Sequence, residues 1–76
     1  MIKELVEYIV KTLVDDPSAV RVTSDHTNNQ YQVVIAIAAP DRGRVIGRNG
    51  ETIRAIRALA CVVAPPSSEV KVEIAE

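Results

Sequence analysis

The sequence predicts one α+β domain in which helices pack on one face of a three-stranded mixed sheet. Two segments, 2–14 and 51–63, repeat apolar residues at spacings of three and four, which is typical of amphipathic helices. Alternating segments around 20–23, 31–39 and 70–74 are typical of strands. The 76 residues leave room for a single domain spanning 1–76. The predicted order is α-β-β-α-α-β.

The first helix and the hairpin after it follow from spacing and turn chemistry. The helix ends near Asp15-Asp16-Pro17. Val20 and Val22 then alternate with polar residues, and the polar run 27–30 supplies asparagines that tolerate a positive φ. A β-hairpin is therefore expected here.

The second strand, 31–39, is apolar on both faces, which favours a central position in the sheet. One face carries four large side chains: Tyr31, Val33, Ile35 and Ile37. The other carries smaller ones or an amide: Gln32, Val34, Ala36 and Ala38.

The second half of the chain predicts two helices and a last strand. Pro40-Asp41 favours a short helix, because proline suits a first helical position and aspartate the positive end of the helix dipole. The segment 47–50 interrupts it, and the helix 51–63 ends before 65–68. About thirty residues separate the last two strands, so these strands are expected to be parallel neighbours with a right-handed crossover.

Composition excludes several classes of protein. One cysteine, Cys61, and one histidine, His26, exclude an internal disulfide and a thiolate metal cluster, and no cofactor is expected. Charged residues within 1–14 are unlike a secretory or membrane segment, so a cytoplasmic protein without membrane contact is expected. No catalytic constellation is found. The net charge of −1 argues against a strongly basic nucleic-acid binder, but residues 42–57 carry five arginines against one acid, Glu51, a local charge of +4.

Two of the three glycines stand three apart in VIGRNGETIRAIR, residues 45–57, between an apolar pair and a helix. Each glycine inside a helix costs about 1 kcal/mol relative to alanine, so the pair indicates a bend or a close approach by a ligand. Backbone amides at the start of the helix 51–63 lack intrahelical partners and attract anions. A phosphate chain is the predicted ligand. A plain helix-to-helix turn is the alternative interpretation of a GxxG taken alone.

The stretch VIGRNGETIRAI resembles the (V/I)IGxxGxxIxxI signature of KH domains. The element order is that of a type II KH domain, and DRGRVIGRNGETIRAIRAL is similar to small bacterial single-domain KH proteins of the KhpA (YlqC) family. The resemblance implies binding of single-stranded RNA, or less often DNA, with a loop that holds the backbone of about four nucleotides.

The resemblance also implies roles for individual residues. The loop Gly47, Arg48, Asn49 and Gly50 clamps phosphates. Four residues lie near the floor of the nucleobase groove: Gly43, Val45, Ile46 and Ile53. Residues 65–69 and 70–72 form the opposite wall. Without aromatic residues near the loop, bases rest on aliphatic side chains and sequence discrimination is loose.

The sequence allows two interpretations for two sets of residues. Arg54 and Arg57 share the outer face of the helix 51–63, where they extend the phosphate track or form a solvated face in which Glu51 pairs with Arg54. For Arg42 and Arg44 the same two interpretations, phosphate contact or a solvated face, stay open. The isoleucines 46, 53 and 56 are core residues, groove residues or both, with Ile56 expected in the core. Cys61 is expected to be a small packing residue and His26 to be solvated.

These features favour a non-enzymatic RNA-binding module that acts as an RNA chaperone or post-transcriptional regulator. The alternative is a protein-interaction subunit, with RNA contact secondary. The resemblance implies self-association or pairing with a larger KH protein, and the apolar face of Val34, Ala36 and Ala38 is the expected interface. A homodimer or a heterodimer is thus an expected partner state.

Overall fold

A computed structural model describes residues 1–75 and follows the predicted order of elements. The helices and strands are α1 (Ile2–Leu13), β1 (Arg21–Thr27), β2 (Gln30–Ala36), α2 (Arg42–Ile46), α3 (Glu51–Val63) and β3 (Glu69–Ile74). Three single 3₁₀ turns connect them: η1 (Pro17–Ala19), η2 (Ala39–Asp41) and η3 (Arg48–Gly50). The predicted α+β class is confirmed.

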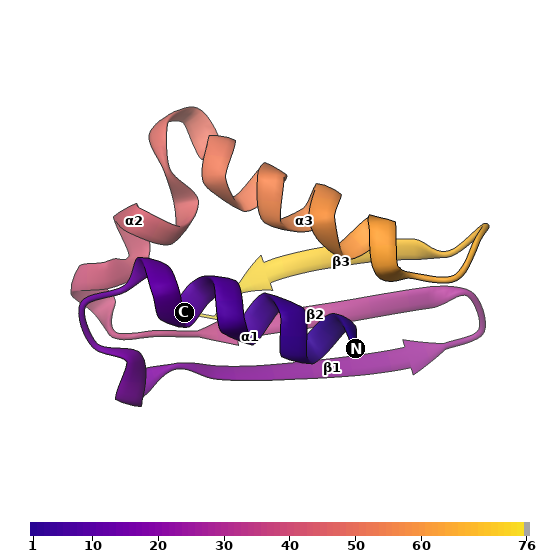
Figure 1. Cartoon of the computed structure of the whole chain (residues 1–76), viewed down its shortest axis with the longest axis horizontal. Helices are drawn as coiled ribbons and strands as arrows, with labels where there is room; N and C mark the ends of the chain where they lie inside the picture. The colour runs from indigo at the N-terminus through magenta and orange to yellow at the C-terminus, as the bar shows by residue number, and fades with distance from the viewer. Residues whose placement is uncertain (76) are drawn as a thin grey trace.

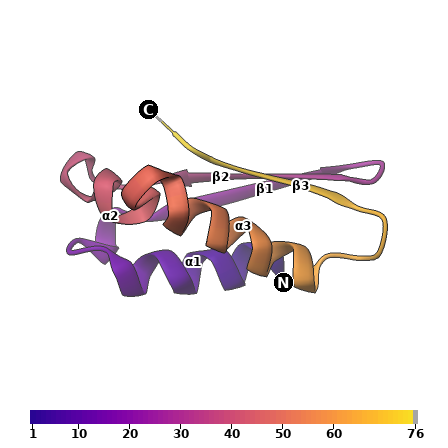
Figure 2. The same ribbon diagram turned by 90° about the horizontal axis from the view of Figure 1, so that it is seen from above.

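The sheet has the order β1-β2-β3 and mixes both strand directions. β1 and β2 form an antiparallel hairpin through Asn28-Asn29, with Asn28 at a φ of 55°. β3 runs parallel to β2, with Val33 opposite Val72. Figure 1 shows the long crossover through α2 and α3, and Figure 2 shows α1 and α3 on the same side of the sheet. The predicted central position of the second strand and the parallel third strand are confirmed.

The core lies between the sheet and this helical layer. Its buried side chains are aliphatic, and those that are fully buried include Val6, Val10, Val33, Ile35 and Ile56. Val33 and Ile35 face the helices from the central strand, and Ile56 faces the sheet from α3. Complete burial of one such side chain contributes about 1.5–3 kcal/mol. The expectation that Ile56 belongs to the core is confirmed.

Two strand limits differ from the prediction. β1 begins at Arg21, after the buried Val20, and β2 ends at Ala36 rather than at 39. The pairing explains both, because Arg21 is the partner of Ala36 and no residue of β1 lies opposite 37 or beyond. The 3₁₀ turn η2 then begins at Ala39, with Pro40 as its second residue. Ala38 therefore lies outside the sheet.

Asp41 is the one charged residue whose side chain is buried within residues 1–75, with an exposed fraction of 2%. Its carboxylate oxygens accept hydrogen bonds from the backbone amides of Asp15, at 3.1 Å, and Asp16, at 3.2 Å. The sequence predicted Asp41 at the positive end of the short helix, and Asp41 is the residue before the first turn of α2, but its side chain makes no hydrogen bond to that turn. A buried carboxylate needs such donors, and the loop after α1 supplies them. Asp41 therefore holds that loop against the start of α2.

The sheet face away from the helices is more polar than the sequence suggested. Val34 and Ala36 are only partly exposed on it. In the paired register, Thr23 lies beside Val34 on one flank and Glu73 lies beside it on the other. The predicted apolar interface is thus reduced to two central side chains with polar residues on both sides. No helix of residues 1–75 has the length and hydropathy needed to cross a bilayer.

Candidate nucleic-acid interface

The loop between α2 and α3 is shaped by three residues with positive φ. Gly47 has φ 75° and ψ 175°, Asn49 has φ 55°, and Gly50 has φ 75° and ψ 16°. The last two values are left-handed, which asparagine and glycine tolerate best. The conformation of Gly47 lies in a region that is essentially restricted to glycine. The chain thereby turns from α2 into α3 within four residues, 47–50.

The same turn leaves backbone amides open at its tip. The amides of Gly47 and Gly50 donate to Gly43 and Gly47 carbonyls at 2.9 and 3.2 Å. For the amides of Arg48 and Asn49, residues 1–75 provide no acceptor, and both residues are exposed. The open donors therefore lie at the loop tip, whereas the sequence predicted them at the start of the helix 51–63, which is α3. Adjacent open amides beside a guanidinium favour an anionic oxygen.

Arg54 links α3 to this loop. Its Nη1 donates a hydrogen bond of 2.8 Å to the carbonyl oxygen of Asn49, the residue of this loop that adopts a left-handed backbone without being a glycine. The alternative ion pair with Glu51 is not found in residues 1–75. One guanidinium thus both supports the loop and leaves further donors beside it.

A hollow of about 500 Å³ continues from Arg54 along α3 and the edge strand β3. Its helical side consists of four residues on one face of α3: Arg54, Arg57, Ala58 and Cys61. Its other side consists of the start of β3 and the residue before it: Ser68, Glu69, Val70 and Lys71. An edge strand has backbone groups without strand partners, which can pair with nucleobase edges. The wall predicted at 65–69 and 70–72 therefore coincides in part with the observed one.

The predicted floor residues are not equivalent in the structure. Val45 is completely buried, so its side chain supports α2 from within the core and has no surface for RNA. Ile46 and Ile53 are partly exposed, and Gly43 is exposed on α2. None of the four lines the hollow between α3 and β3.

The arginines of α2 also differ from one another. Arg44 is paired with Asp15 at 3.2 Å, and both side chains are more than half exposed. Such a surface pair contributes only about 0–1 kcal/mol, so Arg44 can exchange this partner for a phosphate. Arg42 is partly buried at the start of α2. Neither arginine lines the hollow, and RNA contact by Arg42 and Arg44 stays a prediction.

Cys61 was expected to be a packing residue, and this expectation is wrong. Its thiol is free and the residue is exposed along the hollow. The spacing 54, 57, 58 and 61 places these residues on one helical face, and this signal was available in the sequence. His26 is exposed, as predicted. No group of three potential metal ligands occurs within residues 1–75.

The element order, the mixed sheet and a GxxG turn between two helices define a type II KH fold. A family model described as KhpA/KhpB, KH domain, matches residues 3–74. The chain belongs to this family, which is non-enzymatic, as the sequence predicted.

Several curated relatives are similar over most of their length. RNA-binding protein KhpA of Chlamydia pneumoniae is 40% identical over 97% of this chain and 96% of its own. The protein of the same name from Listeria monocytogenes is 36% identical over 97% and 99%, respectively. That from Streptomyces coelicolor is 40% identical over 75% and 72%. No solved structure matches the chain.

Proposed function

We propose that this protein binds single-stranded RNA in the cytoplasm and acts as an RNA chaperone or post-transcriptional regulator. The observation that carries the proposal is the loop 47–50, where the amides of Arg48 and Asn49 are open beside the Arg48 guanidinium. Relatives that are 36–40% identical over nearly the whole chain are named RNA-binding proteins, which supports the same ligand.

In this proposal the loop holds phosphates and the hollow beside it holds bases. The groups at the loop tip are donors, which suits phosphate oxygens, and they form no ordered pattern that could read a base. The hollow has no aromatic side chain, so bases contact Ala58 and the aliphatic stems of Arg54 and Arg57. Stacking on rings contributes about 1–3 kcal/mol per base, and its absence here makes the affinity of one domain modest.

Titration with an unstructured oligoribonucleotide of about six residues tests the proposal. We expect the backbone amide resonances of Arg48 and Asn49 to shift in saturable fashion, because phosphate oxygens become their acceptors. Each bound phosphate contributes about −0.7 to the slope of log K against log salt for single strands, so a few phosphates give a slope of about −2. Saturation without any shift of residues 47–50 would leave only an architectural turn. The same titration with DNA of equal sequence measures the preference for RNA.

Replacing Gly43 with alanine separates the groove from the fold. Beyond the neighbouring backbone of α2, no heavy atom of residues 1–75 lies within 4 Å of a Cβ at this position, and Gly43 lies inside α2. The variant is therefore expected to be about 0.5–1 kcal/mol more stable, as measured by urea unfolding. If a base lies against Gly43, RNA affinity falls at the same time. Unchanged affinity would remove Gly43 from the proposed groove.

A second candidate function is pairing with another KH domain through the helical layer. Large apolar side chains that are strongly exposed belong to α1 and α3 or to the residue before α1: Met1, 85%; Tyr8, 73%; Leu59, 49%; and Val62, 80%. Exposed apolar side chains on a small domain favour contact with a partner. These side chains are more exposed than Val34 and Ala36 on the sheet face that the sequence suggested. Pairing two weak modules raises their apparent affinity for one RNA.

Light scattering at micromolar concentration tests the pairing. We expect a mass above that of one 8.3 kDa chain. Val62→Lys is expected to restore the mass of a monomer, because it places a charge in the interface. The matched control is Val34→Lys on the sheet face, which leaves the mass of the parent. A monomeric parent, or an effect of the control alone, would contradict pairing through the helices.

A further inference from the structure

The helix-facing side of the sheet is left uncovered at the hairpin end. Val22, Ser24 and His26 share one face of β1, because side chains alternate along a strand. Val22 is buried, whereas Ser24 and His26 are exposed on that same face. α1 begins at Ile2 and α3 ends at Val63 without covering this corner. Polar side chains thus occupy positions that the strand pattern assigns to the core.

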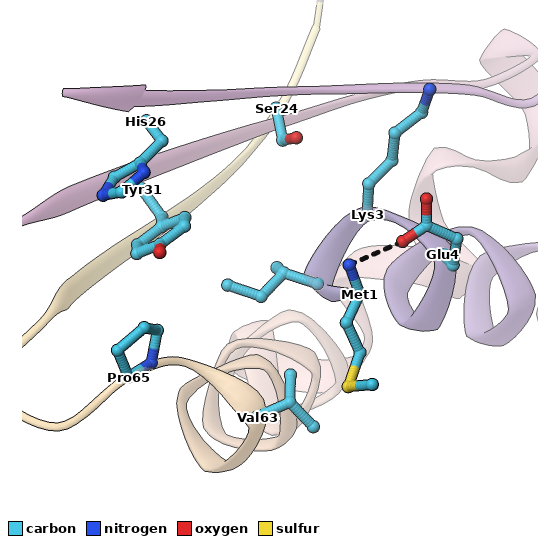
Figure 3. Close-up of a pocket in the computed structure, with 9 residues that line it drawn as sticks. Met1, Lys3, Glu4, Ser24, His26, Tyr31, Val63 and Pro65 are labelled. Atoms are coloured by element: carbon cyan, nitrogen blue, oxygen red, sulfur yellow. Dashed lines mark ion pairs between the residues drawn. The ribbon is translucent and has the colours of Figure 1, made fainter.

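A pocket of about 280 Å³ fills this corner. Figure 3 shows the rings of His26 and Tyr31 on one side of it, with Lys3 and Met1 on the other. Val63 and Pro65 close it from α3 and the segment that follows. The GxxG loop is at the opposite end of the molecule (Figure 1). This pocket is therefore distinct from the loop and from the hollow beside β3, with which it shares no lining residue.

The two rings form a flat aromatic surface. Their centroids are 4.0 Å apart and their planes differ by 7°, and His26 and Tyr31 are cross-strand partners in the hairpin. Each ring covers one face of the other and leaves its second face without a stacking partner in residues 1–75. Such rings are stacking platforms for flat heteroaromatic groups.

The charges opposite the rings favour an anion. The terminal ammonium of Met1 pairs with Glu4 at 2.8 Å, and this hydrogen bond is the main cause that lowers the pKa of Glu4. Glu4 is thus ionised and offsets the terminal charge. Lys3 has no ion-pair partner in residues 1–75. The ammonium of Lys3, the hydroxyl of Ser24 and an aromatic surface are thus combined in one pocket.

We propose that this pocket binds one nucleotide, with its base on the His26–Tyr31 ring pair and its phosphate beside Lys3. A purely apolar ligand would leave Lys3 and Ser24 desolvated without partners. A divalent cation is disfavoured, since the single carboxylate there is already paired. The volume is close to the lower end of about 300–1,000 Å³ for small-ligand pockets, which suits one nucleotide.

The nucleotide has two sources with the same chemistry: a residue of a bound RNA strand or a free mononucleotide. The hollow beside β3 ends at Ser68, and Pro65 in the same connection lines the pocket. A strand that leaves the hollow therefore reaches the pocket by crossing the segment 64–68. The first source rests on the proposed RNA binding, whereas the second does not.

Amide and ring resonances of Ser24, His26 and Tyr31 report on both sources. The two probes are AMP and an unstructured oligoribonucleotide of about eight residues, compared with one of about four that fills the loop groove alone. Shifts with the longer strand but not with the shorter one identify a strand residue. Shifts with AMP and with neither strand identify a free nucleotide. If none of the three probes moves these resonances, the pocket binds no nucleotide and the proposal is wrong.

Variants provide the second readout. His26→Ala removes the exposed ring and is expected to weaken nucleotide binding to the pocket by about fivefold or more. Lys3→Gln is expected to weaken the same binding and to reduce its salt dependence. The matched control is Asp25→Ala, adjacent on β1 but on the other sheet face, which leaves pocket binding unchanged. An equal loss in His26→Ala and Asp25→Ala would overturn the proposal.

The loop resonances keep the two proposals apart. Shifts at 47–50 without shifts at 24, 26 and 31 under any probe leave the proposed function standing and remove the pocket. If AMP shifts the pocket resonances and RNA does not shift the loop resonances, the pocket proposal stands and the proposed function is wrong.

Discussion

Replacing Arg48 and Asn49 together with aspartate will weaken the binding of single-stranded RNA by more than about tenfold. The double substitution changes the loop charge by −3, and it places two carboxylates beside the open amides that the proposed phosphates would use. Hydrogen bonds to charged groups contribute about 1.5–3 kcal/mol, so the loss of one already exceeds a factor of ten. Both residues are exposed, so the fold is expected to persist. Fluorescence anisotropy with a labelled oligoribonucleotide measures the affinity.

The matched control changes the same charge elsewhere. Lys11→Asp with Thr12→Asp also changes the net charge by −3, on exposed positions of α1 far along the chain from the loop. This control is expected to lose only a small part of the affinity, through the long-range field that salt screens. Circular dichroism establishes that both double variants are folded. Equal losses in the two would show that net charge, and not the loop, controls binding.

Gly47→Ala is expected to have the largest effect on stability among single glycine replacements. A Cβ at Gly47 would lie 2.8 Å from the backbone nitrogen of Thr52 and would overlap the Thr52 hydroxyl oxygen. The backbone dihedrals of Gly47 also disfavour any residue with a Cβ. The strain and the overlap together cost about 3 kcal/mol, a large part of the stability of a domain of this size. Thermal unfolding is then expected to shift down by more than about 10 °C.

The other two glycines provide a graded control for this prediction. Gly50 has ordinary left-handed dihedrals, and a Cβ there would approach only the flexible end of Arg54, at 3.2 Å. Gly50→Ala is therefore expected to cost about 1 kcal/mol. Gly43→Ala has no close neighbour and no positive φ, so it is expected to raise the stability, as stated above. Any other order of the three melting temperatures would contradict this account of the loop.

Apolar periodicity and turn residues were sufficient to predict the fold, because each helix, strand and turn has the residue pattern typical of its kind. The stripe of α1, the alternation in β3 and the asparagine turn of the hairpin all agree with the observed structure. The parallel pairing of β2 and β3 followed from the length of the crossover alone. The end of β2 was missed, because it depends on where its partner strand begins.

The site was only partly predictable, since burial and partners depend on tertiary contacts. The loop 47–50 is readable from the glycine spacing. Three features of the site depend on how α2 and α3 lie against the sheet. These are the burial of Val45, the hydrogen bond from Arg54 to the Asn49 carbonyl and the exposure of Cys61. The pocket at the hairpin end gave no sequence signal beyond two polar residues, Ser24 and His26, in the inward register of β1.

Asp41 has a consequence for engineering the domain. Its carboxylate joins the amides of residues 15 and 16 to the first residues of α2, and Arg44 adds a second link to Asp15. The helix that leads into the loop is thus anchored to a segment some twenty-five residues earlier. A minimal peptide cut around the GxxG turn would lack that anchor. Grafting the turn onto another scaffold must carry the N-terminal third of the chain with it, or supply two equivalent donors for the aspartate.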